Sequence, residues 1–256
     1  MTSSTLITTV DAHGVATLTL NRPDRSNSYD QALLDALAAE TQRLGGDASV
    51  RAIVLRGTGK HFCAGADIGA HDSAKSADQR TTLPGLCHDI DTVAKPTVAL
   101  VRGACIGGGV AFAACCDVVI AERDAVFALP EVRLGFAPGP LIPFLLHAIP
   151  ARSLRRYLVS GERFGAEEAL RIGLVHELCD AAGADAALAR MLDEMLRAAP
   201  GAAASAKRAL RRLGGGASKE LLAELQIEFQ QGFESAEAQE GRASFREKRK
   251  PAWAPK

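Results

Sequence analysis

The feature that most constrains the fold is a glycine turn between an apolar segment and a predicted helix. Residues 96–101, Pro-Thr-Val-Ala-Leu-Val, are typical of a buried strand, and Gly107–Gly109 form a turn without side chains. From Val110 onward the residues are small, apolar and compatible with a helix. Such a turn lets a ligand approach the main chain. The first helical N–H groups lack internal partners and favour negative charge, so we expect the turn to bind an anionic oxygen.

The spacing of the glycines argues against a nucleotide phosphate. The dinucleotide fingerprint G-x-G-x-x-G fails because Phe112 stands where the third glycine belongs. A P-loop requires G-K-[ST], but His61 follows Gly59-Lys60. The remaining interpretation is an oxyanion that forms during a reaction and is stabilised by backbone N–H groups.

A second turn of the same kind lies upstream. An oxyanion hole usually combines two N–H donors. The predicted strand Arg51–Leu55 leads to a turn of small residues at Cys63–Ala66. The sequence therefore holds two candidate donors, each placed after a strand.

Three ordered motifs across nearly the whole chain resemble the crotonase (enoyl-CoA hydratase/isomerase) superfamily. They are Gly57-x-Gly59-x-His61-Phe62-x-Ala64-Gly65-Ala66-Asp67, Gly103-x-x-x-Gly107-Gly108-Gly109 and Phe127-x-x-Pro130-Glu131-x-x-x-Gly135. The segment Ser160–Val175 and the tail Phe245–Trp253 also resemble runs of that family.

The resemblance implies an α/β fold, a crotonase-like spiral of ββα repeats in two roughly perpendicular sheets. We expect a spiral core over residues 1–195 and a C-terminal helical oligomerisation region over residues 196–256. The family's assembly implies a homotrimer or a dimer of trimers.

Local signals place several elements. Leu6–Val10 and Val15–Leu20 alternate around a short turn and predict a hairpin, and Asp30 is the expected N-cap of the helix that follows. In the family, residues 69–92 correspond to a variable helix and loop over the acyl pocket. His71, Asp89 and Asp91 belong to that segment and are expected at the surface.

Composition limits the partners and the compartment. Apolar residues make up 47% of the 256 residues, and 30 basic residues balance 30 acidic ones. This balance does not favour general attraction to nucleic acid or to an anionic membrane. The basic residues of 202–213 predict a solvated helix face, so no nucleic-acid partner is expected. The six cysteines form no C-x-x-C pair and no targeting segment is recognisable, so we expect a cytoplasmic protein with free thiols.

The chemistry expected from the resemblance is the stabilisation of a thioester enolate. By motif, the two donors are the backbone N–H groups of Ala66 and Gly108, and Glu131 is the proton donor and acceptor. Glu131 follows an apolar strand with few polar neighbours, which predicts a raised pKa suited to proton transfer. No metal or redox cofactor is implied, and coenzyme A enters as part of the substrate.

The resemblance also implies contacts with the coenzyme A carrier and the acyl group. In relatives the loop after Asn21-Arg22-Pro23 lies along the carrier, and the interpretation of Arg22 as a carrier contact or as an ordinary loop residue stays open. The candidate binding residues are Arg25, Ser26, Ser28, Ala64, Asp67, Ile68, Gly107, Pro130 and Lys248.

One departure leaves the reaction type open. Hydratases of this family usually have a second glutamate three residues after the hole-forming glycine, and here that position is Ala111. The segment Gly135–Pro143 departs as well, since its three prolines predict a stiffer wall that bears on substrate choice. We expect an enoyl-CoA hydratase. A single-glutamate 3-enoyl/2-enoyl-CoA isomerase, a decarboxylase, a hydratase-aldolase and a weakly active CoA-thioester binder remain alternatives.

Overall fold

A six-stranded sheet forms the centre of the computed structural model, which describes residues 4–68, 81–213 and 219–253. The strands follow the order β1-β2-β3-β4-β6-β9. Their bounds are Leu6–Val10 for β1, Val15–Leu20 for β2, Ala52–Gly57 for β3, Thr97–Val101 for β4, Val118–Glu122 for β6 and Glu177–Cys179 for β9.

The predicted hairpin is confirmed at the edge of this sheet. β1 pairs antiparallel with β2, with Leu6 opposite Leu20 and Val10 opposite Ala16. Every later pairing in this sheet is parallel, from β2 with β3 to β6 with β9. Parallel neighbours need crossover connections, so a helix or a longer excursion separates them and covers the sheet.

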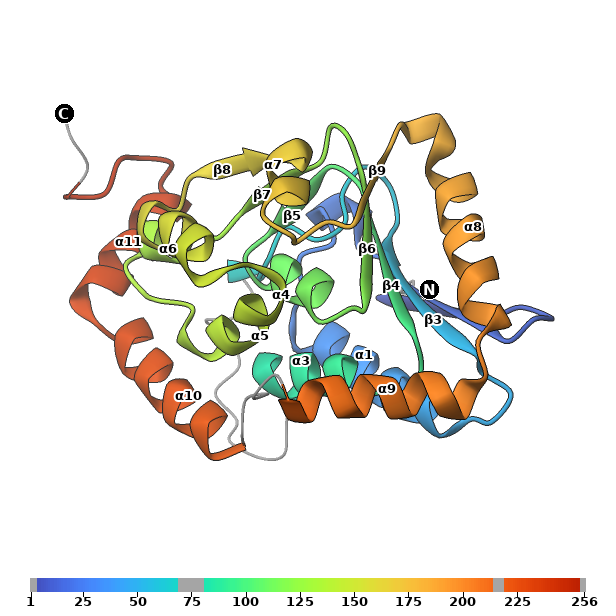
Figure 1. Cartoon of the computed structure of the whole chain (residues 1–256). Coiled ribbons are helices and arrows are strands. Elements are labelled where there is room, and N and C mark those ends of the chain that lie inside the picture. The colour runs from blue at the N-terminus through green and yellow to red at the C-terminus, as the bar shows by residue number, and fades with distance from the viewer. Residues whose placement is uncertain (1–3, 69–80, 214–218, 254–256) are drawn as a thin grey trace.

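Both faces of the sheet are buried at its central strands, whereas the edge strand β1 is largely exposed. Alternating residues of β3 point to opposite sides: Ile53 and Leu55 join the main core, whereas Val54 packs in a second cluster with Ala187 and Leu188. Those two residues belong to α8 (Ala184–Arg197), which runs along one side of the sheet (Figure 1). This double burial explains why β3, β4 and β6 are nearly continuous apolar runs, whereas β1 and β2 alternate.

The main core is closed by α1 (Gln31–Gly46), α3 (Leu83–Thr92) and the short α4 (Gly108–Ala114). Asp30 caps α1 as predicted, its side chain accepting a hydrogen bond from the Leu33 N–H. All but the last residue of α4 are buried, and α4 contacts β4, α3 and α5 (Ile142–Ala148). The small residues at most positions of α4, with Val110 and Phe112 as the exceptions, allow this close packing.

A smaller sheet carries the second half of the fold. It has three strands in the order β5-β7-β8, with bounds Ala104–Ile106, Val126–Ala128 and Arg163–Gly165. β5 leads directly into the glycine turn before α4, and β7 leads into the 3-10 helix η2 (Pro130–Leu134). The sheet therefore places the ends of two strands beside each other, since β5 and β7 pair in parallel.

The remaining helices are α6 (Ala151–Ser160), α7 (Ala166–Arg171), α9 (Pro200–Leu213), α10 (Lys219–Phe233) and α11 (Ala236–Arg246). The short 3-10 segments are η1 (Pro23–Arg25), η3 (Gly139–Leu141) and η4 (Ala181–Gly183). The last two helices lie on the opposite side of the molecule from α8 (Figure 1). α10 contacts η3 and α11 contacts η2, so both pack against the part of the fold that follows β7.

The basic face of α9 is more than a solvated surface, which corrects the expectation for Lys207 and Arg211. The Lys207 Nζ lies 2.8 Å from Asp117 Oδ2, and the Arg211 Nε lies 3.0 Å from Asp91 Oδ2. These ion pairs tie α9 to α3 and to the start of β6, and Lys207 is also largely buried.

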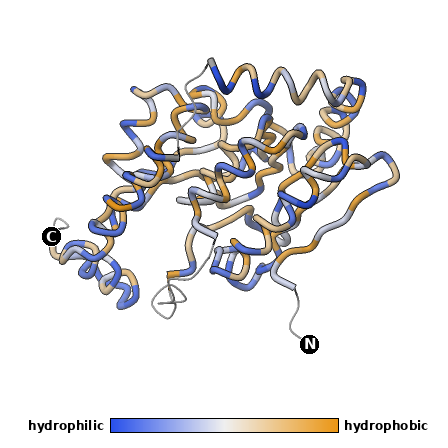
Figure 2. Tube along the Cα trace, turned by 90° about the horizontal axis from the view of Figure 1, so that it is seen from below, coloured by the Kyte–Doolittle hydropathy of each residue, from blue (hydrophilic) through white to orange (hydrophobic). Residues whose placement is uncertain are grey.

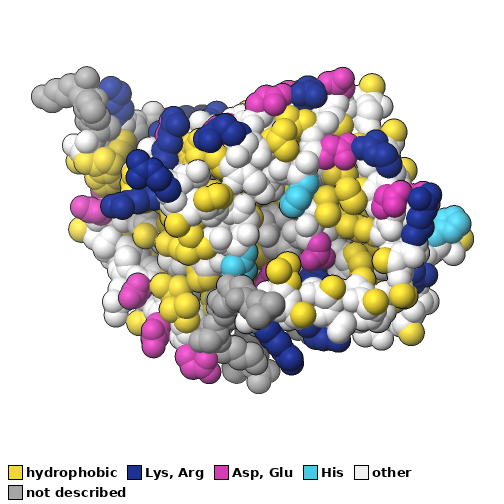
Figure 3. Space-filling model, in the orientation of Figure 1, with side chains coloured by type: hydrophobic (Ala, Val, Ile, Leu, Met, Phe, Trp, Pro, Cys, Tyr) yellow, Lys and Arg dark blue, Asp and Glu magenta, His cyan; other side chains and the backbone are white. Residues whose placement is uncertain are grey.

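The surface agrees with the neutral composition. Lys and Arg side chains lie beside Asp and Glu on the face drawn in Figure 3. The outer helices alternate between hydrophilic and hydrophobic residues, whereas the interior segments are mostly hydrophobic (Figure 2). All six cysteines are free and buried. In the described ranges, no helix combines the length and apolar character needed to cross a bilayer.

Asn27 joins the loop between β2 and α1 to the end of β3. Its side chain is fully buried and accepts a hydrogen bond from the Arg22 N–H at 2.8 Å. It donates to the carbonyl oxygens of Thr58 at 2.9 Å and His61 at 2.7 Å. This single amide therefore satisfies three backbone groups of two chain segments that border the glycine turns.

Replacing Asn27 by Ala should lower the free energy of unfolding by about 2–4 kcal/mol, because three backbone groups would lose their partner. Urea unfolding followed by circular dichroism measures this loss. Asn21→Ala is the matched control, since the Asn21 amide makes one exposed hydrogen bond to the Ser4 carbonyl oxygen. Equal stability of the two variants would contradict the assigned role of Asn27.

Candidate active site

The glycine turn presents the Gly108 N–H without an acceptor. The carbonyl oxygen of Gly107 accepts hydrogen bonds from the Val110 N–H at 2.9 Å and the Ala111 N–H at 3.4 Å. In a trans peptide the C=O and N–H point in opposite directions, so fixing this carbonyl within α4 turns the Gly108 N–H away from the helix. Across the described part of the chain, the Gly108 N–H has no acceptor.

The second turn repeats this arrangement at Ala66. The Gly65 carbonyl oxygen accepts a hydrogen bond from the Tyr29 N–H at 2.9 Å, and the Asp67 N–H donates to the Tyr29 carbonyl oxygen at 2.9 Å. Tyr29 therefore clamps the backbone on both sides of Ala66. The Ala66 N–H points away from this clamp and, among the described residues, meets no acceptor.

The two turns are in contact through their glycines. A Cβ atom on Gly107 would lie 4.0 Å from the Gly65 Cα, and one on Gly109 would lie 2.6 Å from the Cys63 carbonyl oxygen. Gly107 also has φ 55° and ψ −123°, a backbone conformation that only glycine adopts readily. Side chains at these positions would push the turns apart, so the glycines bring the two unpaired amides together.

Glu131 lies against the same turn. It is the second residue of η2, where the chain leaves the smaller sheet, and only 9% of its surface is exposed. Its Oε1 is 2.9 Å from the position that a Cβ on Gly107 would occupy. Its Oε2 is buried, and within the described residues it has no hydrogen-bond partner. A carboxyl oxygen left unpaired in this way is free to bind or exchange a proton with a ligand.

Burial raises the pKa of Glu131 from its ordinary value of 4.5 to about 7, and a hydrogen bond from its own backbone opposes part of that rise. Removal of the carboxylate from water disfavours the charged form. A group with such a pKa is present in both protonation states near neutral pH. Glu131 can therefore accept and return a proton within one reaction cycle.

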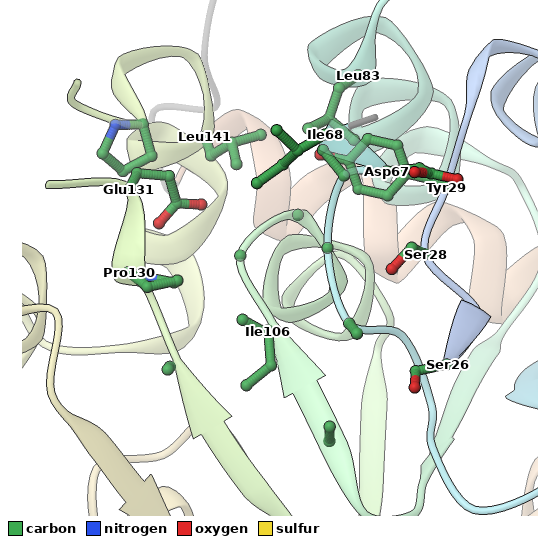
Figure 4. A pocket seen from close by; sticks show the side chains of 18 of the residues that line it. Ser26, Ser28, Tyr29, Asp67, Ile68, Leu83, Ile106, Pro130, Glu131 and Leu141 are labelled. Atoms are coloured by element: carbon green, nitrogen blue, oxygen red, sulfur yellow. The ribbon is translucent and has the colours of Figure 1, made fainter. Parts of the chain in front are cut away.

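A cavity of about 1960 Å³ opens in front of these groups. Both candidate amide residues, Ala66 and Gly108, line it together with Glu131. Figure 4 shows Glu131 and Pro130 on one side of the cavity, Tyr29, Ser28 and Ser26 on the other, and Ile68, Leu83 and Leu141 along its upper edge. The volume exceeds that of an ordinary drug-sized pocket, and it suits a long substrate.

Most of the predicted binding residues border this cavity, and Lys248 does not. The lining includes Arg25, Ser26, Ser28, Ala64, Asp67, Ile68, Gly107 and Pro130. Lys248 is exposed just beyond the end of α11 and has a positive φ of 53°.

Arg22 is engaged inside the protein rather than in the cavity. Its guanidinium group lies 2.9 Å from Asp67 Oδ2 and 3.1 Å from Asp30 Oδ2, and it donates to the Ser28 carbonyl oxygen. These contacts hold the Ser26–Ser28 loop against the turn that carries Ala66. The Asp67 carboxylate is thus engaged by Arg22. Asp67 therefore helps to orient the Ser26–Ser28 loop and also borders the cavity.

The segment predicted to form a stiff wall does border the cavity. Its contributors are Phe136, Pro138, Pro140 and Leu141. Phe136 also makes edge contacts with two aromatic side chains of α10, at centroid distances of 5.5 Å to Phe229 and 5.4 Å to Phe233. α10 was not predicted to border the cavity, because amphipathic spacing does not reveal what a helix packs against.

The position of the absent second glutamate lies behind the turn. Ala111 is fully buried in α4 and does not line the cavity. Asp89 accepts a hydrogen bond from Gln42, and Asp91 pairs with Arg211, so neither faces the site. The expectation for His71 concerns a residue outside the described ranges.

Tyr29 also lines the cavity, although no motif of the sequence predicted it as a site residue. Its side chain is 5% exposed, and its ring makes an edge contact with Phe112 at 5.5 Å. A Cβ on Gly108 would lie 2.5 Å from its hydroxyl oxygen. One feature of the sequence could have indicated it: Tyr29 directly follows the Asn27-Ser28 pair, which the resemblance places beside the carrier.

Together these groups can stabilise a developing negative charge on oxygen and move a proton beside it. Two unpaired N–H groups converge on one region, and the carboxyl group of raised pKa faces the same cavity. In the described part of the chain, no cluster of His, Cys, Asp and Glu is arranged to hold a metal ion.

The chain is similar to proteins of one enzyme family over almost its full length. A sequence model of the family described as Enoyl-CoA hydratase/isomerase matches residues 11–256. A 2,3-dehydroadipyl-CoA hydratase from Escherichia coli (strain K12) is 32% identical over 239 residues, which cover 93% of this chain and 94% of the relative.

Solved structures agree with this similarity. An enoyl-CoA hydratase/isomerase from Pseudoalteromonas atlantica T6c superposes with a TM-score of 0.88 at 28% identity, covering 98% of this chain and 100% of its own. Pseudomonas aeruginosa AtuE superposes with a TM-score of 0.78 at 37% identity, covering 98% and 100% of the two chains. The predicted fold, with two sheets and C-terminal helices, is therefore confirmed.

The buried carboxyl of Glu131 should make stability depend on pH. In the unfolded chain it loses its proton near 4.5, and in the folded protein near 7. Between these values the folded state binds more protons, so the free energy of unfolding falls as pH rises through that window. The full difference corresponds to about 3 kcal/mol. Glu131→Gln should therefore gain about that much relative to the unaltered protein between pH 4.5 and 8, measured by urea unfolding.

Glu228→Gln is the control for this comparison, because Glu228 is exposed on α10 and does not line the cavity. Its stability should follow the unaltered protein at each pH. A Glu131→Gln variant with the same pH dependence as the unaltered protein would contradict the raised pKa.

Proposed function

The chain belongs to the enoyl-CoA hydratase/isomerase (crotonase) family, and from that premise we propose that it is an enoyl-CoA hydratase, adding water to a 2-enoyl-CoA thioester. One observation supports the proposal most directly. Ala66 and Gly108, whose backbone N–H groups are unpaired, line the same cavity as Glu131, whose Oε2 is buried and unpaired. The relative from Escherichia coli bears the name of a hydratase, which supports this choice within the family.

In the proposed reaction the thioester oxygen accepts hydrogen bonds from the Ala66 and Gly108 N–H groups. The Glu131 carboxylate takes a proton from water as the water oxygen bonds to the β carbon. The electron pair of the double bond moves toward the carbonyl, and the resulting enolate carries its charge on the bound oxygen. The two amides stabilise this charge more than the neutral carbonyl, which is the condition for catalysis.

The protonated Glu131 then returns its proton to the α carbon, so water has been added and the carboxylate is restored. One carboxyl group handles both transfers, so the oxygen and the hydrogen arrive on the same face and the addition is syn. A pKa of about 7 suits this double role, because neither protonation state is strongly favoured near neutral pH.

The carrier would lie along the Ser26–Ser28 loop, and the acyl chain would extend toward Ile68, Leu141 and the aromatic side chains of α10. We propose that residues 196–256 serve assembly into a trimer or a dimer of trimers. Lys248, which does not line the cavity of its own chain, would contact coenzyme A bound to a neighbouring subunit across such an interface.

A second candidate is a 3-enoyl/2-enoyl-CoA isomerase. It is favoured by Ala111, which supplies no second carboxylate. Of the other carboxylates that line the cavity, Asp67 pairs with Arg22, Glu122 pairs with Arg102 at 2.9 Å, and Asp124 is exposed to solvent. One free carboxyl could remove a proton from one carbon and return it to another.

Incubation with crotonyl-CoA tests the hydratase. We expect the absorbance of the conjugated thioester to fall in the presence of the protein, and Glu131→Gln to slow this fall about a hundred-fold or more. Glu228→Gln should act like the unaltered protein. The absence of any fall at high enzyme concentration would exclude a hydratase of short enoyl thioesters. A gain of conjugated absorbance from 3-hexenoyl-CoA would favour the isomerase instead.

The pH profile tests the proton transfer. In the hydration direction the free enzyme must begin with ionised Glu131, so kcat/KM should rise with pH and level off above about 7. Initial rates measured from pH 5 to 9 give this profile. A profile that is flat across pH 7 would contradict the assignment of Glu131 as the base.

A further inference from the structure

We propose that the Tyr29 hydroxyl is a third hydrogen-bond donor to the thioester oxygen, beside the amides of Ala66 and Gly108. This inference rests on the proposed function and adds a residue to its oxyanion hole. It follows from the position of Tyr29, the lack of a partner for its hydroxyl and the chemistry of the groups around it.

The position of the hydroxyl is set by Gly108. A Cβ atom on Gly108 would lie 2.5 Å from the hydroxyl oxygen, 2.7 Å from Cε1 and 2.9 Å from Cζ of the Tyr29 ring. A Cα–Cβ bond is about 1.5 Å long, so the hydroxyl oxygen is no more than about 4 Å from the Gly108 Cα. The phenol therefore lies beside the residue whose N–H has no acceptor among the described residues.

The backbone of Tyr29 is equally close to the other amide. Its N–H and C=O hold the residues on either side of Ala66, both at 2.9 Å. Tyr29 thus fixes the Ala66 N–H with its main chain and reaches Gly108 with its side chain. The next residue, Asp30, caps α1, so Tyr29 is attached to a rigid element rather than to a free loop.

The hydroxyl of Tyr29 is available to a ligand. Tyr29 as a residue is 5% exposed and lines the cavity, and no described residue forms a hydrogen bond with its hydroxyl. The edge contact with Phe112 needs only the ring, which phenylalanine would also supply. The hydroxyl can therefore donate a hydrogen bond to a ligand in the cavity.

The surroundings keep the phenol in its donor form. Burial raises the pKa of Tyr29 well above its ordinary value of 10, and the charges of Cys63 and Glu131 act in the same direction. A neutral phenol donates a hydrogen bond, whereas a phenolate could not stabilise a negative oxygen. Glu131 and Tyr29 lie on opposite sides of the cavity (Figure 4), so the carboxyl can act on carbon while the phenol binds oxygen.

Tyr29→Phe removes the hydroxyl and keeps the ring. With crotonyl-CoA we expect kcat to fall about ten- to a hundred-fold while KM changes less than about threefold, because the lost interaction strengthens in the transition state. Tyr157→Phe is the matched control. Tyr157 is the second of the two tyrosines in the chain, it is also buried, and its hydroxyl donates to Glu168 outside the cavity. Tyr29→Leu, which also lacks a hydroxyl, should show the same loss in kcat.

A spectroscopic measurement separates this role from a structural one. Cinnamoyl-CoA bound to Glu131→Gln, which should not turn it over, is expected to absorb at longer wavelength because donors polarise its carbonyl group. Adding Tyr29→Phe should reduce this shift. An undiminished shift, with unchanged kcat for Tyr29→Phe alone, would overturn the role of Tyr29 and leave the two-amide site intact. No shift in either protein would overturn the oxyanion hole and the role of Tyr29 with it.

Discussion

The site depends on two peptide groups whose carbonyl oxygens are already hydrogen-bonded. The Gly107 carbonyl is held by the first turn of α4, and the Gly65 carbonyl is held by the Tyr29 N–H. Because each peptide is planar and trans, fixing the carbonyl also fixes the direction of the N–H on the other side. The amides of Gly108 and Ala66 are therefore oriented before any ligand arrives, so no reorganisation is needed during the reaction.

This orientation requires close packing of backbone against backbone. Gly65, Gly107 and Gly109 leave no side chain between the turn after β3 and the turn after β5. α4 is surrounded by core residues and cannot shift, and Asn27 attaches the neighbouring loop to the end of β3. The stability of the core is thus used to hold polar groups in an unsatisfied state. The unpaired carboxyl of Glu131 is a further such group. Its removal from water is unfavourable for the charged form, and this loss of hydration raises its pKa.

The C-terminal helices complete the cavity from outside the spiral. Gly241 of α11 packs directly on the Leu134 backbone, and Gly135 packs on Glu237, so α11 supports the short helix that carries Glu131. α10 adds Phe229 and Phe233 to the wall beside Phe136. The Glu131 carboxyl and the aromatic wall of the cavity therefore come from parts of the chain about a hundred residues apart.

The sequence by itself determined the features that depend on local pattern. Alternating apolar residues predicted β1 and β2, and Asp30 predicted the start of α1. The family motifs pointed to Ala66, Gly108 and Glu131, and these three residues line one cavity. Only the tertiary structure decided that Tyr29 reaches Gly108, that Lys207 and Arg211 form ion pairs, and that α10 borders the cavity. The physical reason is range: periodicity and capping act within a few residues, whereas these contacts join segments whose separation in the chain carries no local signal.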